Sequence, residues 1–347
     1  MSTLPIAITQ GDPAGIGPEI IAKAFRDAPD VTRGCFVAGD VATMRRAAKF
    51  ITGVGQVALP VVEIHTVNEA LAVPPRCIPV LSVLQASALV QVGAINASAG
   101  RMAADCVIWA ARAALRGDIA AIVTAPLHKE ALAAAGVHFP GHTELLQAEA
   151  SAHLGRPLSE VPVRMMLANG ELKTVLVSIH LSLRDAIAAV TTDNVLQTLR
   201  LTHDFLLRTS TAGQTRRRIG VAGLNPHAGE GGLFGREEID VILPAMAQGR
   251  REGMDVQGPF APDTVFMRAR ARDGEPGEFD VVVAMYHDQG LIPVKYLGVE
   301  KGVNVTIGLP LVRTSPDHGT AFDIAGTGQA DASSLIEAIR VARQLAL

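Results

Sequence analysis

The sequence has few aromatic residues and no excess of charge of either sign. Phenylalanine, tyrosine and tryptophan make up 4% of the 347 residues, whereas the hydrophobic fraction as a whole reaches 48%. The 31 lysines and arginines are balanced by 34 aspartates and glutamates. A nucleic-acid partner requires a basic face that replaces counterions on phosphates. We therefore expect no nucleic-acid partner.

Cysteines are also scarce, and long apolar runs are lacking. Cys35, Cys77 and Cys106 are widely separated and form no Cys-x-x-Cys pair, which favours reduced structural thiols over a disulfide framework. No run approaches the roughly 20 apolar residues that a membrane span needs, and the first residues do not have the pattern of a signal peptide. The sequence therefore predicts a soluble cytoplasmic protein with no membrane partner.

Short apolar runs alternate with helix-like segments along the chain. Runs such as 119–124 and 281–285 are typical of buried parallel strands, and 98–115 and 191–207 are typical of helices. This alternation predicts an α/β fold with mainly parallel sheets, and the length favours two domains. A glycine pattern at 53–58 follows a helix and precedes a strand, the reverse of the Rossmann context. We therefore expect no classical Rossmann domain.

Three histidines occupy equivalent positions in three separate segments. His180, His227 and His287 each come just after a predicted buried strand, and ligands bind outside the carboxyl ends of parallel strands. One such histidine is usually a packed or capping residue, but three imidazoles with an open position suit a catalytic divalent metal ion. Asp288 is expected to support the metal or an imidazole. Asp263 has the same potential, with turn chemistry after the preceding proline as the alternative.

A second group of polar residues favours an anion. Lys295 and Arg313 follow strand-like apolar runs, where a buried charge needs either a substrate anion or a protein carboxylate as its partner. The loop 10–17, between a strand and a helix, either presents N–H groups to an anion or is a tight connection without a ligand. Segment 317–326 combines Gly, Thr and an acid in a way that suits a nucleotide. The group also includes His142, Thr143 and Asn304.

Six motifs occur together, in order, between residue 6 and about residue 340. They are Gly11-Asp-Pro-Ala-Gly-Ile-Gly-Pro-Glu19, Ala125-Pro-Leu-His-Lys129, Gly141-His-Thr-Glu144, Leu224-Asn-Pro-His-Ala-Gly-Glu-Gly-Gly232, Met285-Tyr-His-Asp-Gln-Gly290 and Arg313-Thr-Ser-Pro-Asp-His-Gly-Thr320. This set resembles the 4-hydroxythreonine-4-phosphate dehydrogenase family.

The resemblance implies an architecture. The fold would be that of isocitrate and isopropylmalate dehydrogenases, with two α/β domains and an active site in the cleft between them. One domain, 1–135 plus 305–347, would carry both termini and the nucleotide loop, and 136–304 would form the other. The protein would be a homodimer in which His287 reaches into the partner's site.

The resemblance also implies an activity and its residues. The substrate 4-phosphohydroxy-L-threonine would be oxidised with NAD or NADP to 2-amino-3-oxo-4-phosphonooxybutanoate, which then loses CO2 to give 3-amino-2-oxopropyl phosphate in pyridoxal phosphate biosynthesis. The ion would be zinc, cobalt, magnesium or manganese. The implied roles are metal binding for His180, His227 and His287; substrate binding for His142, Thr143, Lys295, Asn304 and Arg313; nucleotide binding for His318, Gly319, Thr320 and Asp323, the last favouring NAD; and catalysis for Asp288 and Lys295.

One segment departs from the pyridoxal-pathway pattern and leaves the substrate open. Residues 178–185, Ser-Ile-His-Leu-Ser-Leu-Arg-Asp, look nearer to relatives that act on 4-phospho-D-threonate or 4-phospho-D-erythronate. Another relative oxidises a terephthalate cis-dihydrodiol, whose carboxylate would take the place of the phosphate. A metal-dependent phosphatase or hydrolase and a non-catalytic sugar-acid-binding protein are alternatives of other classes. Segment 317–326 favours a dehydrogenase over a phosphatase or hydrolase, because a hydrolase needs no nucleotide loop.

Overall fold

The chain divides into two compact units in the computed structural model, which describes residues 4–85, 88–139, 141–209, 217–272, 274–298 and 301–346. The first unit contains Met1–Val161 and Leu309–Leu347, and the second contains Pro162–Gly308. The sequence interpretation had placed residues 136–161 with the second domain, whereas their contacts group them with the first unit. Helix 142–154 packs on the long helix 97–116 of the first unit, which explains this assignment.

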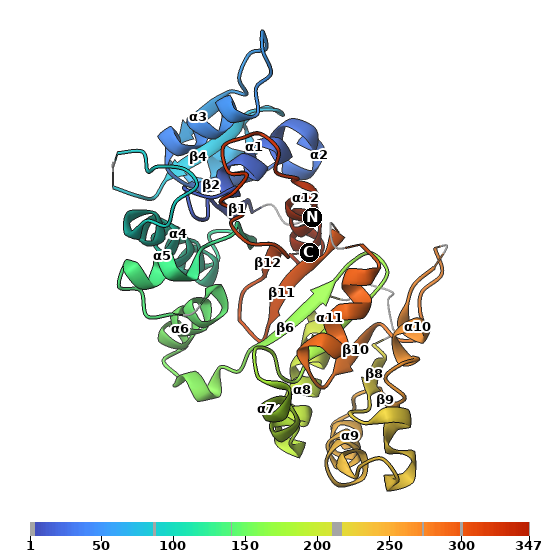
Figure 1. The fold of residues 1–347 in the computed structure, drawn as a ribbon. Coiled ribbons are helices and arrows are strands. Elements are labelled where there is room, and N and C mark those ends of the chain that lie inside the picture. The colour runs from blue at the N-terminus through green and yellow to red at the C-terminus, as the bar shows by residue number, and fades with distance from the viewer. Residues whose placement is uncertain are drawn as a thin grey trace. The chain divides into compact units, whose positions relative to one another are not determined.

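The first unit is a parallel sheet covered by helices. Its strands lie in the order β3-β4-β2-β1-β5-β12, and every pairing among them is parallel. Their bounds are β1 Ile6–Thr9, β2 Cys35–Gly39, β3 Val61–Ile64, β4 Ile78–Ser82, β5 Ala121–Thr124 and β12 Arg313–Pro316. The helices are α1 Gly17–Asp27, α2 Pro29–Thr32, α3 Val41–Phe50, α4 Ala97–Arg116, α5 Lys129–Ala134, α6 His142–Leu154 and α12 Ser333–Leu345, with short turns η1 Val67–Leu71 and η2 Leu158–Glu160. Helices α4, α5 and α6 form one group, and α1, α3 and α12 form another (Figure 1).

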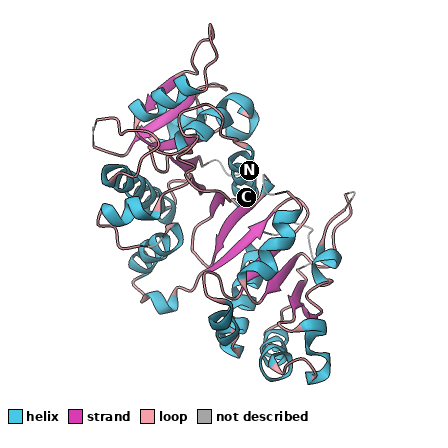
Figure 2. Ribbon diagram, viewed as in Figure 1, coloured by secondary structure: helices cyan, strands magenta, loops and turns pink. Residues whose placement is uncertain are grey.

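The second unit has a mixed sheet in the order β11-β6-β7-β10-β8-β9. Strand β6 is antiparallel to both of its neighbours, and β7, β10, β8 and β9 run parallel. The bounds are β6 Arg164–Ala168, β7 Lys173–Leu176, β8 Ile219–Ala222, β9 Val256–Phe260, β10 Val281–Ala284 and β11 Val303–Ile307. The helices are α7 Leu183–Ala189, α8 Thr192–Thr209, α9 Leu243–Arg251, α10 Val265–Ala269 and α11 His287–Tyr296, with turns η3 Pro226–Gly232 and η4 Glu238–Ile242. Figure 2 shows this alternation of strands and helices, and the predicted α/β class with mainly parallel strands is confirmed.

Local sequence explains why the long helix α4 begins and ends where it does. The Asn96 side chain accepts hydrogen bonds from the backbone N–H groups of Ser98 and Ala99, at 2.7 and 3.3 Å, and so caps the first turn. Gly117 ends the helix in the left-handed conformation, with φ of 79°. Between these caps, small alanine side chains allow a close approach to α5. A Cβ on Gly100 would lie 2.1 Å from the Ala131 carbonyl oxygen.

Strand β10 lies at the centre of the second unit's parallel strands, as its apolar sequence predicts. All four of its residues are buried, and the strand lies between β7 and β8. Helices α10 and α11 pack on one face of this sheet over a core that includes Leu176, Val282, Leu291 and Val294. Within the ranges that the structure describes, no helix combines the length and apolar character needed to cross a membrane.

Candidate functional site

The second unit brings the three histidine-bearing segments to one edge of its sheet. His180 lies four residues beyond β7, His227 lies beyond β8, and His287 begins α11 just after β10. Strands β7, β10 and β8 are adjacent and parallel, so their carboxyl ends are neighbours. The sequence-based placement of each histidine after a buried strand is therefore confirmed.

His180 and His287 lie next to each other. Their ring centroids are 5.7 Å apart, with 43° between the ring planes. His287 Nδ1 and Asp288 Oδ1 are 2.7 Å apart. A carboxylate in this position can orient a metal-binding imidazole.

His227 lies in a loop with an unusual backbone. Its φ of 52° is followed by 53° at Ala228 and 43° at Glu230, so three non-glycine residues adopt the left-handed conformation. Each such residue costs about 1–2 kcal/mol, and such strain persists only where surrounding contacts hold it. His227 borders a pocket together with Asp263 and Asp288. Within the described ranges, no three His, Cys, Asp or Glu side chains gather closely enough to hold one metal ion, so the three-histidine centre stays a prediction.

Two side chains connect these strand ends by hydrogen bonds. The sequence analysis assigned a role to neither of them. The Gln289 side chain accepts from the Met285 N–H at 2.7 Å and donates to the Gly223 carbonyl at 2.8 Å. The Ser178 hydroxyl donates to the Met285 carbonyl at 3.1 Å. These bonds link the segments that precede His287, His227 and His180. The sequence feature that would have indicated this role is the position of Gln289 in the first turn of a helix that follows a buried strand.

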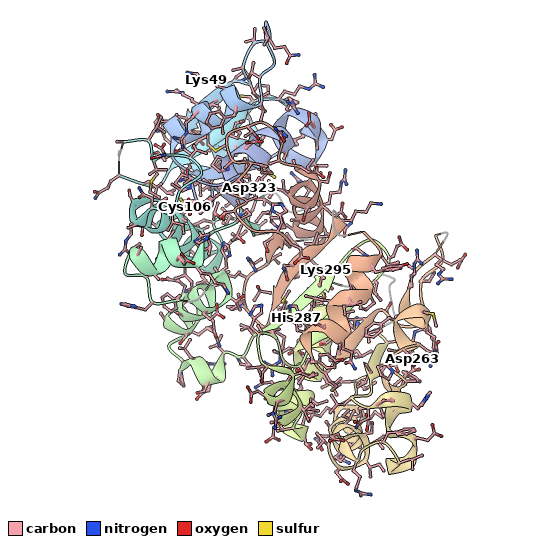
Figure 3. The ribbon with its side chains drawn as sticks, viewed as in Figure 1. Lys49, Cys106, Asp263, His287, Lys295 and Asp323 are labelled. Atoms are coloured by element: carbon pink, nitrogen blue, oxygen red, sulfur yellow. The ribbon has the colours of Figure 1, made fainter. Side chains whose placement is uncertain are left out.

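Lys295 lies on a helix, and the expectation that it follows a strand is wrong. Residues 287–296 form α11, with Pro293 inside it and Lys295 in the last turn (Figure 3). The apolar run follows helical spacing, because Leu291 and Val294 are buried and Ile292 is exposed. Gly290 permits the close packing on β7 that excludes an extended chain here: a Cβ there would be 2.4 Å from a Leu176 methyl carbon.

Asn304 and Arg313 lie in different units. Asn304 is the second residue of β11 in the second unit and pairs with Leu167 of β6. Arg313 is the first residue of β12 in the first unit, where the preceding run 309–312 is not a strand. Arg313 is 6% exposed, and burial lowers the pKa of its guanidinium to about 10 while nearby Glu144 opposes the shift. The group therefore stays charged at neutral pH.

His142 and Thr143 begin α6 of the first unit and are half-buried. Burial, and then the positive charge of Arg313, lower the pKa of His142 well below its usual range. A neutral imidazole beside a buried guanidinium leaves the net positive charge with Arg313. The arrangement suits an anionic substrate group better than a cationic one.

The predicted nucleotide segment packs against the loop that follows β1. The Thr320 carbonyl accepts from the Ile16 N–H at 3.0 Å, and a Cβ on Gly15 would meet Thr320 at 2.9 Å. Phe322 stacks on His128 with centroids 4.9 Å apart. Of the predicted nucleotide residues, Thr320 is buried, whereas His318, Gly319 and Asp323 are exposed; Figure 3 labels Asp323.

This edge of the first unit also contains buried polar atoms that lack partners. Among the described residues, no hydrogen bond reaches Thr9 Oγ1, Gln10 Nε2, Asp12 Oδ2 or His128 Nδ1. Burial raises the pKa of Asp12, although its other oxygen accepts the Ala14 N–H at 2.9 Å. Buried polar groups of native proteins are almost always paired, so this edge suits a polar ligand such as a dinucleotide.

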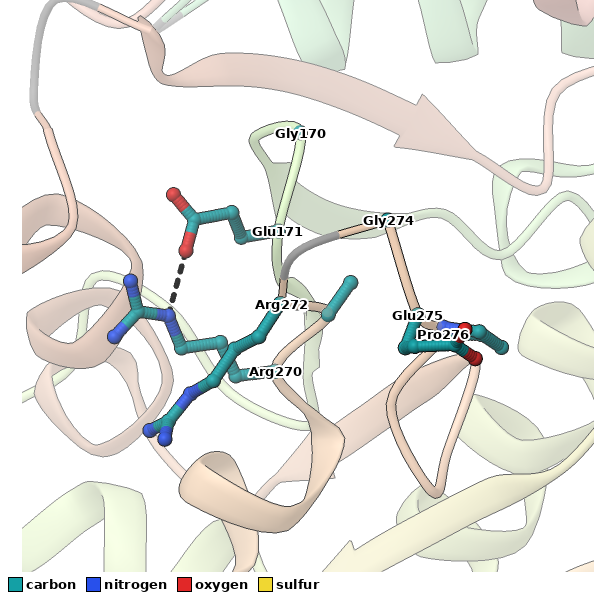
Figure 4. Close-up of a pocket in the computed structure, with 8 residues that line it drawn as sticks. Gly170, Glu171, Arg270, Arg272, Gly274, Glu275 and Pro276 are labelled. Atoms are coloured by element: carbon teal, nitrogen blue, oxygen red, sulfur yellow. Dashed lines mark hydrogen bonds and ion pairs between the residues drawn. The ribbon is translucent and has the colours of Figure 1, made fainter.

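A more polar pocket elsewhere in the second unit is structural. Figure 4 shows Glu171 and Arg270 paired across it, with 2.6 Å between Arg270 Nε and Glu171 Oε2. Arg268 of the same segment pairs with Glu278 at 2.6 Å. None of the predicted site residues lines this pocket. It contributes charge balance at the surface rather than chemistry.

Comparison with known proteins identifies the family. The model of the family described as pyridoxal phosphate biosynthetic protein PdxA matches residues 32–342. The chain therefore belongs to the PdxA family. Its relatives are named as dehydrogenases, which makes it an oxidoreductase acting on a CH–OH group and argues against the hydrolase alternative.

The matches extend over the whole chain. A 4-hydroxythreonine-4-phosphate dehydrogenase of Beijerinckia indica is 52% identical over 98% of this chain and 95% of the relative. A D-threonate 4-phosphate dehydrogenase of Salmonella typhimurium is 45% identical over 100% of both chains. A crystal structure of 4-hydroxythreonine-4-phosphate dehydrogenase from Klebsiella pneumoniae has a TM-score of 0.85 at 41% identity and covers 99% of this chain and 100% of that one.

Proposed function

We propose that this protein oxidises the secondary alcohol of a phosphorylated hydroxy acid with NAD or NADP, in a reaction that depends on a divalent metal ion and ends in loss of CO2. The observation that carries the proposal is the position of His180, His227 and His287 after three adjacent parallel strands, at their carboxyl ends. Membership of a family whose members are named dehydrogenases supports redox chemistry at such a site.

The donor set fits a divalent ion. His180 and His227 of one copy, with His287 of the partner subunit, would offer imidazole nitrogens, which suit zinc, cobalt and manganese. Asp288, which contacts Nδ1 of His287, would orient that ring so that Nε2 could bind the ion. The chemistry gained from a bound ion is polarisation of the substrate hydroxyl, which lowers its pKa.

Other residues of the chain hold the substrate and move protons. We assign the phosphate to Arg313 and Lys295, with His142, Thr143 and Asn304 as further contacts. Asp288 and Lys295 are the proposed proton-handling groups. One of these groups would take the proton of the substrate hydroxyl, and one would return a proton to the carbon from which CO2 is lost.

The nucleotide loop of the first unit is the proposed dinucleotide site. His318, Gly319, Thr320 and Asp323 lie on the segment that packs against loop 10–17, where buried polar atoms lack partners among the described residues. Bound NAD or NADP supplies the hydride acceptor. An exposed carboxylate at Asp323 favours a ribose hydroxyl over a phosphate, and therefore NAD over NADP.

The proposed assembly is a homodimer in which His287 serves the partner's site. Large apolar side chains remain exposed around the pocket that contains His227: Met267 is 59% exposed, Ile292 63% and Tyr296 90%. Exposed apolar groups gathered in this way are typical of a surface that a partner covers. A second copy of the chain is the proposed partner.

The leading substrate is 4-phosphohydroxy-L-threonine, and D-threonate 4-phosphate is the second candidate. The segment 178–185, which departs from the pyridoxal-pathway pattern, supports the second. Within it, Ser182 caps α7: its hydroxyl accepts from the Asp185 N–H at 3.2 Å and donates to the Asp185 carboxylate at 2.6 Å.

The test measures formation of reduced nicotinamide with NAD or NADP, a divalent metal ion and each substrate in turn. We expect turnover with at least one phosphorylated hydroxy acid, CO2 release in equal amount, and loss of both after chelation or in His180→Ala. Phosphate release without reduced nicotinamide, for every substrate tried, would overturn the proposal in favour of a hydrolase. Comparison of kcat/KM for 4-phosphohydroxy-L-threonine, D-threonate 4-phosphate and a carboxylated dihydrodiol assigns the substrate.

A further inference from the structure

A buried carboxylate lies behind the His227 loop. Glu238 is 2% exposed and opens the wide turn η4, which follows the loop after residues 233–237. We propose that Glu238 is a positioning residue that holds the left-handed loop and thereby places the His227 imidazole. The inference rests on the proposed function only in taking His227 as a metal ligand.

The loop requires an external support. His227, Ala228 and Glu230 all have positive φ, alternating with Gly229 and Gly231 at 81° and 66°. L-residues disfavour this region, so a run of them persists only where other contacts determine the conformation. Backbone bonds contribute to this, such as Ala228 N–H to the Asn225 carbonyl and Phe234 N–H to the Gly229 carbonyl, both at 3.1 Å. A buried side chain adds further support.

Glu238 supplies that support at the start of the loop. Its Oε1 accepts from the backbone N–H groups of Leu224 and Asn225, at 2.7 and 2.8 Å, and its Oε2 accepts from Asn225 Nδ2 at 3.0 Å. Charge-assisted bonds of this kind are stronger than neutral ones. Both oxygens are used, so the carboxylate fixes the two residues that lead into Pro226 and His227.

The loop also closes around the same carboxylate. A Cβ on Gly229 would lie 2.6 Å from Glu238 Oε2, and a Cβ on Gly223 would lie 3.1 Å from Oε1. The carboxylate thus occupies the inner side of the loop, and the glycines provide the space for it. A change in the shape or hydrogen bonding of residue 238 is transmitted to the backbone that carries His227.

The neighbouring Glu237 provides a matched control. Glu237 is half-buried, and its Oε2 accepts from Asn225 Nδ2 at 2.6 Å; within the described part of the chain, its side chain forms no bond to the backbone of residues 224–232. In E237Q the amide oxygen can keep that single bond. Both carboxylate oxygens of Glu238 accept hydrogen bonds. In E238Q, the introduced amide therefore places its NH2 group against a donor. The two variants remove the same charge one residue apart, and only E238Q places an amide against the backbone donors of the loop.

The experiment measures the dissociation constant of Co²⁺ and Zn²⁺ for the full-length protein without substrate, by competition with a chromophoric chelator. We expect E238Q to bind about 10- to 100-fold more weakly than wild type, as for other groups that orient metal ligands, and E237Q to change less than about threefold. The visible spectrum of the Co²⁺ form should change in E238Q. NAD affinity, which depends on the first unit, should not.

Two further variants separate the outcomes. If wild type and His227→Ala both fail to bind metal, the proposed metal function is wrong. If wild type binds, His227→Ala loses binding and folded E238Q binds as wild type does, the role of Glu238 is overturned while the function stands. If E238Q does not fold, Gly229→Ala tests the same point, because its Cβ would press on Glu238 Oε2; metal binding as tight as wild type in that variant would contradict the inference.

Discussion

The hydroxyl of Thr124 accepts two hydrogen bonds from Arg313, at 3.0 Å from Nε and 2.7 Å from Nη2. Thr124 ends β5 and Arg313 begins β12, and the two strands are paired in parallel. The threonine therefore fixes the plane of a buried guanidinium that is proposed to bind the substrate phosphate. A planar fork recognises an anion only when its orientation is set.

Thr124→Val should raise the KM for the phosphorylated substrate by about tenfold or more, because a hydrogen bond to a charged group is worth about 1.5–3 kcal/mol. Thr124→Ser keeps the hydroxyl and should restore the wild-type value to within about threefold. Steady-state kinetics on the best substrate checks both variants. An unchanged KM in Thr124→Val would mean that Arg313 needs no such orientation.

Gln289→Leu should destabilise the protein by about 2–4 kcal/mol, because the Met285 N–H and the Gly223 carbonyl both lose a side-chain partner at the ends of buried strands. Gln248→Leu is the control, since Gln248 bonds only with exposed side chains on α9 and should change stability by less than about 0.5 kcal/mol. Urea unfolding of the two variants measures the difference. Equal stability of the two variants would show that the hydrogen bonds of Gln289 do not contribute to the free energy of unfolding.

His142 predicts a definite pH dependence. Its pKa is lowered in the folded chain, so below the ordinary value of 6.5 the unfolded chain takes up a proton that the folded chain does not. Stability is then constant above that pH and falls as the pH decreases, by at most about 1.4 kcal/mol per pH unit for one proton.

His142→Gln should reduce that acid slope, and His153→Gln, which alters an exposed histidine at the end of the same helix, should retain it. Unfolding free energies measured from neutral to mildly acidic pH make the comparison. A slope in His142→Gln equal to that of wild type would contradict the assignment.

Gly290→Ala should cost about 1–3 kcal/mol in spite of the better helix propensity of alanine, because the new Cβ would lie 2.4 Å from a buried Leu176 methyl carbon and 3.0 Å from the Ala284 Cβ. Gly249→Ala in α9 should instead stabilise by about 0.5–1 kcal/mol, because its nearest neighbour, the Met254 sulfur, is 3.5 Å away. Thermal unfolding compares the two. A stabilised Gly290→Ala variant would show that α11 is free to move away from β7.

Local patterns were sufficient for much of the fold. Apolar runs such as 281–285 indicate strands because a parallel strand buried on both faces has no solvent-exposed side. Helix α4 begins and ends at residues with clear capping chemistry. The position of each histidine after its strand followed from the same patterns. Lys295 was misplaced because a short apolar run does not distinguish a strand from a helix, and only the packing of Gly290 on β7 decides between them.

The sequence by itself determined the α/β class, the strand ends on which the candidate residues lie, and the resemblance to the family that the comparisons then identified. The tertiary structure decided which of these residues meet. The adjacency of His180 and His287, the bonds from Arg313 to Thr124 and the support of the His227 loop by Glu238 depend on strand order. Strand order is set by long-range packing of buried faces, which no local window of residues encodes.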